Sequence, residues 1–334
     1  MPAPAGPLAA RLFAQLADGR FHSGEALAKR LQVTRSAIWK AATSLRTLGV
    51  PLQAVRNRGY RLERPATPLD AAGIREHLPP GLRAQVGKLE TVWSTGSTNS
   101  VLLARPGPAS GVSEVLLAEY QSAGRGRRGR TWLAPPGGAI CLSLSWTFRE
   151  VPPDLGALGL VIGVCALRAL RAQGLKSAAL KWPNDLLVGE RKLAGILIDL
   201  RAEGAGPAHV VIGIGLNVAL GGPLLAKIAR AGTPATDLTS AGLEKPPRNE
   251  IAASLIGECL RGLGEFERHG LRAFAAEWHS ADALRGRAVD VRATEGSSER
   301  GLARGIDVHG ALMVETPQGV RRFISGEVTV RAAG

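Results

Sequence analysis

Cysteine and histidine are scarce in this 334-residue sequence, and the few present are scattered. The three cysteines, Cys141, Cys165 and Cys259, form no Cys-x-x-Cys pair and cannot all form disulfides with one another. This usage indicates a reducing, cytoplasmic environment and core thiols rather than a disulfide scaffold. None of the six histidines stands at the spacing of metal ligands. The sequence therefore gives no sign of a zinc site built from cysteine and histidine.

Long apolar runs are also missing. The longest stretch, Leu155 to Leu167, is too short to span a bilayer and is followed by Arg168 and Arg171, so it predicts a buried helix. The first six residues carry no basic side chain before their apolar part, so no signal peptide is expected. With 45% apolar residues, the chain is expected to be a globular cytoplasmic protein with no membrane partner.

Two glycine motifs that bind nucleotides are incomplete. In residues 81–89 the first glycine of a P-loop is one position out of register, and Leu89 stands where a hydroxyl should bind Mg²⁺. The run Gly213-Ile-Gly215-Leu-Asn-Val218 lacks the third glycine of a dinucleotide fingerprint. If this protein uses a nucleotide, another segment must hold its phosphates.

Positive charge is concentrated near the N-terminus. The whole chain has a net charge of +14, and residues 1–65 alone hold eleven Lys/Arg against three Asp/Glu, a net charge of +8. A small basic domain of this kind is a candidate nucleic-acid binder.

The apolar pattern of this region predicts a winged helix-turn-helix. Helices are expected over residues 7–17, from a Ser23 cap to Leu31, and from a Thr34 cap to Leu48. Residues 52–62 predict two short strands around a basic turn, which is the wing. We expect Arg35, Ser36 and Lys40 to face the major groove of DNA, and Arg56 and Arg58 to contact phosphates or a minor groove. Trp39 is expected in the three-helix core.

Downstream of the break at residues 65–68, the pattern becomes mixed α/β. Strands are predicted over 89–93, 115–120, 139–146, 178–182, 193–200 and 209–214, and helices from 97, over 158–172, 250–269 and 272–279. Short strands near 289–291, 301–306, 311–314 and 327–330 suit a small β-barrel. The expected domains are a winged helix over 1–65, a mixed-sheet domain over 66–284 and the barrel over 285–334.

The densest positive run is Gly124-Arg-Gly-Arg-Arg-Gly-Arg-Thr-Trp132, between two predicted strands. Four guanidinium groups on a glycine-rich backbone suit a polyanion, since each can bind phosphate or carboxylate oxygens bidentately. A solvated basic loop or a nucleic-acid patch would have the same composition. The run alone leaves these interpretations open.

A second dense stretch, Lys181-Trp-Pro-Asn-Asp185 followed by Arg191-Lys-Leu-Ala-Gly195, places polar side chains at strand ends. Trp-Pro fixes Asn184 and Asp185 at a stiff turn, and Lys192 lies early on the returning strand. The alternative is a hairpin with a capped turn and a solvated lysine. The clustering of lysine, asparagine and aspartate favours a functional site.

These two stretches together with Gly213-Ile-Gly-Leu-Asn217 resemble the biotin–protein ligases. With the basic winged helix in front, the chain resembles the bifunctional bacterial form that also represses the biotin operon. The resemblance extends from Phe21 to Val328 and implies a mixed-sheet ligase domain and an SH3-like C-terminal domain. One departure is the segment Leu133 to Gly138, where relatives carry an aromatic residue and Ser-Pro.

The resemblance implies ATP and Mg²⁺ as cofactors, biotin as substrate, and biotinyl-5'-AMP as both intermediate and corepressor. It implies catalytic roles for Lys192, Arg125 and Arg127, and biotin binding by Ser97, Thr98, Asn99, Gln121, Arg125, Gly126, Arg127 and Lys192. It implies nucleotide binding by Trp132, Asn184, Asp185, Asn217, Arg128 and Arg130, with Asp185 on Mg²⁺ and Arg331 near the triphosphate.

The implied partners are the biotin carboxyl carrier protein of acetyl-CoA carboxylase, operator DNA and a second copy of the chain when adenylate is bound. Two alternatives are a lipoate-type ligase and a DNA-binding sensor without ligase activity. Lys192 and the complete arginine run disfavour the sensor.

Overall fold

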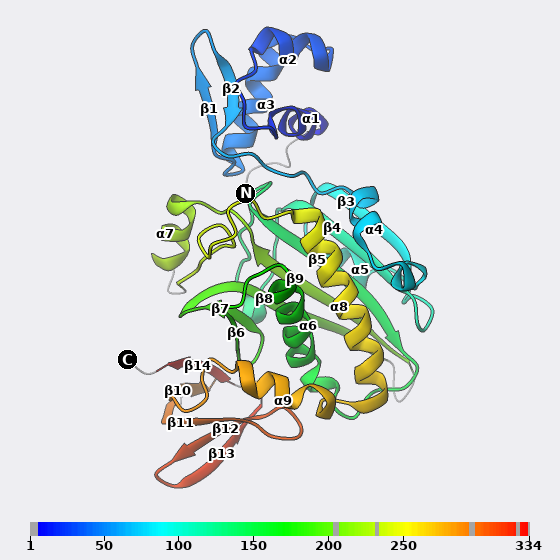
Figure 1. The fold of residues 1–334 in the computed structure, drawn as a ribbon, viewed down its shortest axis with the longest axis vertical. Coiled ribbons are helices and arrows are strands. Elements are labelled where there is room, and N and C mark those ends of the chain that lie inside the picture. Colours follow the sequence, from blue (N-terminus) through cyan, green and yellow to red (C-terminus); the bar gives the residue numbers. More distant parts are fainter. Residues whose placement is uncertain (1–5, 203–206, 231–233, 294–297, 325–327, 333–334) are drawn as a thin grey trace.

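The computed structural model describes residues 6–202, 207–230, 234–293, 298–324 and 328–332, arranged in three parts along the longest axis of the molecule (Figure 1). A helical part lies at one end, a large mixed sheet with its helices in the middle, and a small antiparallel sheet at the other end. The predicted α/β fold class is confirmed.

The N-terminal part consists of α1 (Pro7–Leu16), α2 (Gly24–Leu31), α3 (Arg35–Thr47) and the hairpin β1 (Leu52–Val55) and β2 (Gly59–Leu62). Ser23 and Thr34 cap α2 and α3 as predicted, since their hydroxyls accept from the amides of Ala26 and Ala37 at 3.1 and 3.2 Å. At the hairpin, Gly59 has a φ of +96°, and a Cβ there would lie 1.9 Å from the carbonyl oxygen of His22. Only glycine fits this position, which lets the hairpin close against the segment before α2.

One prediction for this domain is wrong. Trp39 was expected in the core, but its side chain is 57% exposed. The buried face of α3 is formed by the smaller residues Ile38, Ala41, Ala42 and Leu45, which fill the space against α1 and α2. Trp39 lies one position outside this stripe, about 100° around the helix from Ile38, and projects into solvent from the flank of the helix.

The central sheet has seven strands in the order β3-β4-β5-β9-β8-β7-β6. Their bounds are β3 (Val86–Thr95), β4 (Ser113–Gln121), β5 (Ala139–Phe148), β6 (Ala178–Lys181), β7 (Asp185–Val188), β8 (Arg191–Ala202) and β9 (Ala208–Asn217). β3 and β4 run parallel, and each other neighbouring pair runs antiparallel. The sheet is therefore mixed, as expected.

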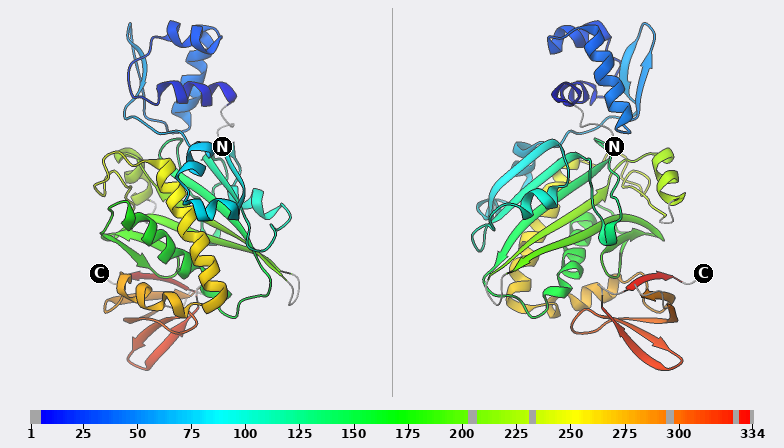
Figure 2. Two further views of the ribbon diagram at one scale, coloured as in Figure 1. Left: turned by 45° about the vertical axis from the view of Figure 1, so that its right-hand side comes forward. Right: turned by 180° about the vertical axis from the view of Figure 1, so that it is seen from behind.

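Helices α6 (Leu158–Ala172) and α8 (Arg248–His269) cover one face of this sheet, and the short α5 (Thr98–Leu103) packs on the other (Figures 1 and 2). The segment Leu155–Ala172 is apolar and long enough to cross a membrane by composition, yet 67% of it is buried inside the structure. It is the buried helix that the sequence predicts.

The sequence did not predict several elements: α4 (Ala71–His77), the 3₁₀ turn at Pro80–Gln85, α7 (Gly222–Arg230) and β13 (Gly319–Phe323). Among these, α7 matters most, because it lies beside the functional site described below. Helix α9 (Arg272–Ala281) agrees with its predicted range.

The C-terminal part is a five-stranded antiparallel sheet in the order β13-β12-β11-β10-β14, with β10 (Ala288–Ala293), β11 (Ser298–Ile306), β12 (Leu312–Thr316) and β14 (Val328–Ala332). The indole nitrogen of Trp182 donates to the carbonyl oxygen of Gly310 at 3.0 Å, which ties this sheet to the central domain. Glu327 and the side chain of Arg331 lie outside the described part of the chain.

Candidate active site

A cavity of about 370 Å³ opens on the face of the central sheet that carries α5. It is lined by thirteen of the residues predicted to bind small molecules: Ser97, Thr98, Asn99, Gln121, Arg125, Gly126, Arg127, Arg130, Trp132, Asn184, Asp185, Lys192 and Asn217. Arg128 instead lines an adjoining hollow, and the side chain of Arg331 lies outside the described part of the chain. Residues from five separate segments of the sequence therefore meet in one site.

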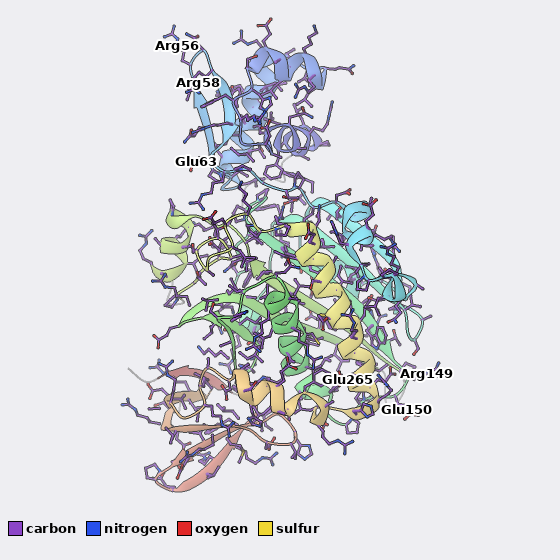
Figure 3. The ribbon with its side chains drawn as sticks, in the orientation of Figure 1. Arg56, Arg58, Glu63, Arg149, Glu150 and Glu265 are labelled. Carbon is purple, nitrogen blue, oxygen red and sulfur yellow. The ribbon has the colours of Figure 1, made fainter. Side chains whose placement is uncertain are left out.

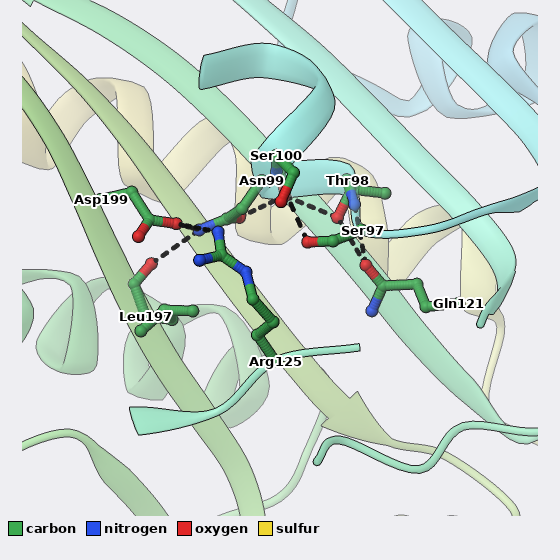
Figure 4. Close-up of polar contacts among 9 residues, drawn as sticks. Ser97, Thr98, Asn99, Ser100, Gln121, Arg125, Leu197 and Asp199 are labelled. Carbon is green, nitrogen blue, oxygen red and sulfur yellow. Dashed lines mark hydrogen bonds and ion pairs between the residues drawn. The ribbon is translucent and has the colours of Figure 1, made fainter. Parts of the chain in front are cut away.

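The first wall of the cavity is the N-terminus of α5 (Figure 4). Ser97 caps this helix, and the next two residues, Thr98 and Asn99, are buried. The Gln121 side-chain oxygen accepts from the Thr98 amide at 2.8 Å and from the Thr98 hydroxyl at 3.1 Å. Buried Ser143 lies 2.6 Å from the Thr98 hydroxyl and 2.5 Å from the Asn99 side-chain oxygen. This network fixes polar groups at one end of the cavity before any ligand arrives.

Asp199, which was not among the predicted site residues, connects this wall to the arginine loop. One of its carboxylate oxygens accepts from the Asn99 side-chain nitrogen at 2.9 Å and from the Arg125 guanidinium at 2.8 Å (Figure 4). Asp199 stands on β8 seven residues after Lys192, within a run that reads as an ordinary strand. Only the folded sheet brings it to Arg125.

The arginine loop is folded back on itself. Arg125 pairs with Thr131 in an isolated β-bridge, and the Gly126 amide donates to the Arg130 carbonyl at 2.7 Å. At the tip, Arg128 and Gly129 have φ values of +56° and +69°. Arg127 and Arg130 line both the cavity and the adjoining hollow, whereas Arg128 lines the hollow and not the cavity.

Arg127 lies across the cavity from β7. Its guanidinium donates to the Asn184 side-chain oxygen at 3.3 Å, and the Asn184 amide in turn donates to the Ile196 carbonyl at 2.6 Å. Burial, and then the neighbouring charge of Arg128, lowers the pKa of Arg127. A guanidinium that is partly stripped of water and crowded by like charge gains from the arrival of an anion.

Lys192 is the cation at the centre of the site. Its ammonium lies 2.5 Å from the Asp185 carboxylate and 5.8 Å from the ring centroid of Trp132. The Lys192 side chain is 20% exposed. Asp185 and Trp132 thus hold a cation in a partly buried position where an anion can reach it.

The glycines of the Gly213-Ile-Gly215 motif make room for site residues. A Cβ at Gly213 would lie 2.4 Å from the Asn99 side-chain oxygen, and one at Gly215 would lie 2.4 Å from the Trp132 ring. The alternate residues Ile212, Ile214 and Leu216 belong to the core on the other face of β9. The glycines of this motif therefore do not form a dinucleotide-binding loop. They leave space on the surface of β9 for the side chains of Asn99 and Trp132.

Asn217, at the end of the same strand, is 3% exposed. Its side-chain nitrogen donates to the carbonyls of Lys192, at 3.4 Å, and Thr236, at 2.9 Å. This amide holds the backbone that carries Lys192.

A buried ion pair anchors the far end of the arginine loop. Glu119 and Arg248 form a salt bridge of 2.9 Å, with side chains 6% and 2% exposed. Glu119 also accepts from the amides of Gly137, at 3.0 Å, and Leu69, at 2.6 Å. Arg248 donates to the carbonyls of Thr67, at 2.7 Å, and Ala139, at 2.6 Å. The pair joins the interdomain linker, β4, α8 and the residues that follow the loop.

Among the described residues that line the cavity, Asp185 is the one carboxylate, while Asp199 lies behind Asn99 and Arg125. Within the described residues, no group of three or more His, Cys, Asp or Glu side chains could hold a metal. Mg²⁺ needs only one or two protein carboxylates when phosphate oxygens complete its shell. Asp185 fits that limited requirement.

The predicted DNA-binding residues lie in the N-terminal domain, away from the cavity. Arg35, Ser36 and Lys40 are exposed on α3, and Arg56 and Arg58 lie along the turn of the wing (Figure 3). The Arg58 guanidinium packs 4.1 Å from the ring centroid of Phe21. None of these five residues lines the cavity.

Comparison with known proteins agrees with this division. Residues 97–217 match the Biotin/lipoate A/B protein ligase family, residues 10–61 match an HTH domain, and residues 285–331 match the Biotin protein ligase C terminal domain. A biotin protein ligase from Aquifex aeolicus, solved in complex with biotin and ATP, shares the fold with a TM-score of 0.62 and 24% identity, over 74% of this chain and 100% of that one.

Two relatives are similar over most of their length. The Biotin--[acetyl-CoA-carboxylase] ligase of Mycobacterium tuberculosis is 35% identical over 80% of this chain and 94% of its own. The Bifunctional ligase/repressor BirA of Salmonella typhimurium is 38% identical over 96% of this chain and 97% of its own. The chain therefore belongs to the bifunctional biotin ligase/repressor family.

Proposed function

We propose that this chain joins biotin to a lysine of a carrier protein in two steps within the cavity. The biotin carboxylate attacks the α-phosphate of ATP, releasing pyrophosphate and forming biotinyl-5'-AMP. A lysine amine of the biotin carboxyl carrier protein of acetyl-CoA carboxylase then attacks the acyl carbon. An amide forms, AMP leaves, and the amine loses a proton.

The observation that carries this proposal is the position of Lys192 among cavity-lining arginines. The first step brings two anions together, so fixed positive charge lowers its barrier. Lys192 would lie between carboxylate and α-phosphate, with Arg125 and Arg127 on the loop side of the cavity. Asp185, at 2.5 Å, orients the ammonium until the substrates arrive.

Ser97, Thr98, Asn99 and Gln121 would bind the ureido end of biotin, since hydroxyl and amide groups suit a neutral polar ring. Gly126 would allow close approach of the loop backbone to the substrates. The network of Ser143 and Asp199 holds Thr98 and Asn99 in place for this role.

Trp132 would stack on adenine, and Asn184 and Arg130 would complete the nucleotide side. Asn217 would act on the nucleotide side indirectly, because its side-chain amide donates to the backbone carbonyl of Lys192 and so positions that residue. Mg²⁺, held by Asp185 and the polyphosphate, would neutralise charge on ATP.

We further propose that residues 1–65 act as the repressor domain, 66–284 as the ligase domain and 285–334 as the C-terminal domain of a cytoplasmic protein. Bound biotinyl-5'-AMP would act as corepressor and favour a homodimer that binds operator DNA at two half-sites.

The decisive measurement is biotin-dependent exchange of pyrophosphate into ATP, which reports the first step alone. Lys192→Ala should lower its rate about 100-fold to 1000-fold, the loss typical when a group that stabilises transition-state charge is removed. Lys176→Ala, at an exposed lysine remote from the cavity, is the matched control and should retain the full rate.

Two results would overturn the assignment. Exchange that lipoate supports and biotin does not would favour the lipoate-type ligase, which the biotin-ligase relatives already disfavour. No exchange with either acid in the wild type would favour the sensor without ligase activity.

A further inference from the structure

We propose that Trp39 is a specificity-determining residue of the DNA-binding face and that it recognises thymine through the C5-methyl group. This inference rests on the DNA-binding half of the proposed function. It begins from the unexpected exposure of the indole, at 57%. The side chain projects from the flank of α3, beside the buried stripe of Ile38, Ala41, Ala42 and Leu45.

The surroundings of Trp39 are basic. Arg35 and Ser36, one turn earlier, and Lys40 and Thr43 are exposed on the same side of α3. Arg56 and Arg58 project from the neighbouring wing (Figure 3). Residues 34–62 contain six Lys/Arg and no Asp or Glu.

This charge selects the occupant of the surface. Two copies of such a positively charged face would repel each other. An acidic protein partner would account for the cations but not for a large exposed apolar ring among them. A DNA duplex supplies both phosphates for the cations and base edges for the indole. Within a winged helix, α3 is the element that enters the major groove.

The chemistry of the indole then limits what it can read. The ring has one N–H donor, no acceptor, and a large apolar surface. Among the base edges of the major groove, the thymine methyl group is the one apolar feature, and apolar side chains contact it. Arg35 and Lys40 suit guanine or phosphate oxygens, so Trp39 adds a different preference to the same helix.

The test uses the full-length chain with biotin, ATP and Mg²⁺ and a pool of random-sequence DNA duplexes. Selection by the wild type should enrich a motif, and Trp39→Ala should lose the preference for thymine at one position in each half-site. Because Trp39 is exposed, the variant should fold as the wild type does, which far-UV circular dichroism checks. Loss of fold in Trp39→Ala would move the test to Trp39→Gln.

The sharper measurement replaces thymidine by deoxyuridine at that position, which removes one methyl group and nothing else. Wild-type affinity should fall about fourfold, the value for one buried methyl group, and the affinity of Trp39→Ala should not change. Lys40→Ala is the matched control, because it should weaken binding to both duplexes equally.

Equal binding of the thymidine and deoxyuridine duplexes by the wild type would overturn the role of Trp39 while leaving DNA binding intact. The same would follow if Trp39→Ala changed self-association and left the selected motif unaltered. Failure of the wild type to enrich any duplex would instead refute the DNA-binding function, and with it this inference.

Discussion

At the scale of single residues, absent side chains shape the site as much as present ones. Trp132 can lie flat on β9 and β8 because Gly215 and Gly195 leave the sheet surface bare. Asn99 can reach Asp199 because Gly213, two residues before Gly215 on β9, also has no side chain to block it. Three glycines therefore determine where an aromatic ring and an amide can sit.

Gly215→Ala should displace the Trp132 ring, because the added Cβ would lie 2.4 Å from a ring carbon. We expect weaker ATP binding in the exchange assay and a loss of about 1–3 kcal/mol in the free energy of unfolding, the range for overpacking. Gly264→Ala, on α8 with no atom within 4 Å of its added Cβ, is the control. It should be neutral or stabilise by about 0.4–1 kcal/mol. Unchanged ATP affinity in Gly215→Ala would show that Trp132 does not contact the nucleotide.

A second residue, Asp282, makes the stability depend on pH. Burial raises the pKa of its carboxyl to about 6. The folded chain therefore keeps this proton to higher pH than the unfolded chain, whose aspartates titrate near pH 4. The stabilisation is complete below about pH 4 and is lost as pH rises through about 6, amounting to up to about 3 kcal/mol.

Urea unfolding between pH 4 and 7 measures this effect. Asp282→Asn should flatten the fall in stability over that interval. Asp290→Asn, at a carboxylate whose side chain is 38% exposed, should leave it unchanged. A pH profile that is identical in the wild type and Asp282→Asn would contradict the assignment.

At the scale of elements, the Glu119–Arg248 pair determines how the arginine loop ends. The pair is buried and each charge has further hydrogen-bond partners on the linker and on the strand that leaves the loop. Breaking such a pair leaves an uncompensated charge in the interior.

Glu119→Gln should lower the free energy of unfolding by about 3–5 kcal/mol, as measured by chemical denaturation. Glu258→Gln is a matched control, since Glu258 also pairs with an arginine of α8, Arg261, in an exposed position. It should change stability by about 0.5 kcal/mol or less. Equal effects of the two substitutions would mean that the buried pair contributes no more than a surface one.

The elements with a clear apolar period were predictable from the sequence. The three N-terminal helices, α6, α8 and the strands of the central sheet other than the short β7 follow such a period. The cavity residues were predictable because they lie in compact motifs that resemble a known family. Asp199, Ser143 and Arg248 were not, since each lies alone in an ordinary strand or helix and reaches its partner only in the fold. Helix α7 was not predicted although Leu224, Leu225 and Ile228 share one of its faces, because its nine residues are too few to establish a helical period.

At the scale of the whole molecule, α1 lies against the segment that follows the arginine loop. The rings of Phe13 and Trp93 are 5.5 Å apart, and a Cβ at Gly137 would lie 2.8 Å from the Phe13 ring. Gly137 also donates to Glu119. The contacts around Gly137 thus involve both the segment that follows the arginine loop and helix α1 of the winged-helix domain. The order of the loop and the position of that domain therefore depend on the same contacts.

Biotinyl-5'-AMP should therefore tighten self-association and DNA binding, by a factor of about 5–150 if the coupling is of ordinary size. Linkage requires that DNA tighten adenylate binding by the same factor, which isothermal titration in the presence and absence of the selected duplex can measure. Proteolysis of residues 119–138 should slow when adenylate is bound, because the loop becomes ordered. If adenylate left both dimer and DNA affinities unchanged, the corepressor role would be refuted.

The hydrogen bonds of the linker also show where the chain could be divided between the DNA-binding domain and the ligase domain. The Ala66 amide bonds to Ala17 in the winged helix, at 2.9 Å, while Thr67, Pro68 and Leu69 all bond to the ligase domain. A chimaera that exchanges the DNA-binding module should therefore be joined between Ala66 and Thr67, where no hydrogen-bonded unit is cut. Residues inserted at this joint would lengthen the tether without removing a ligase contact, so the spacing of the two modules could be varied as an independent parameter.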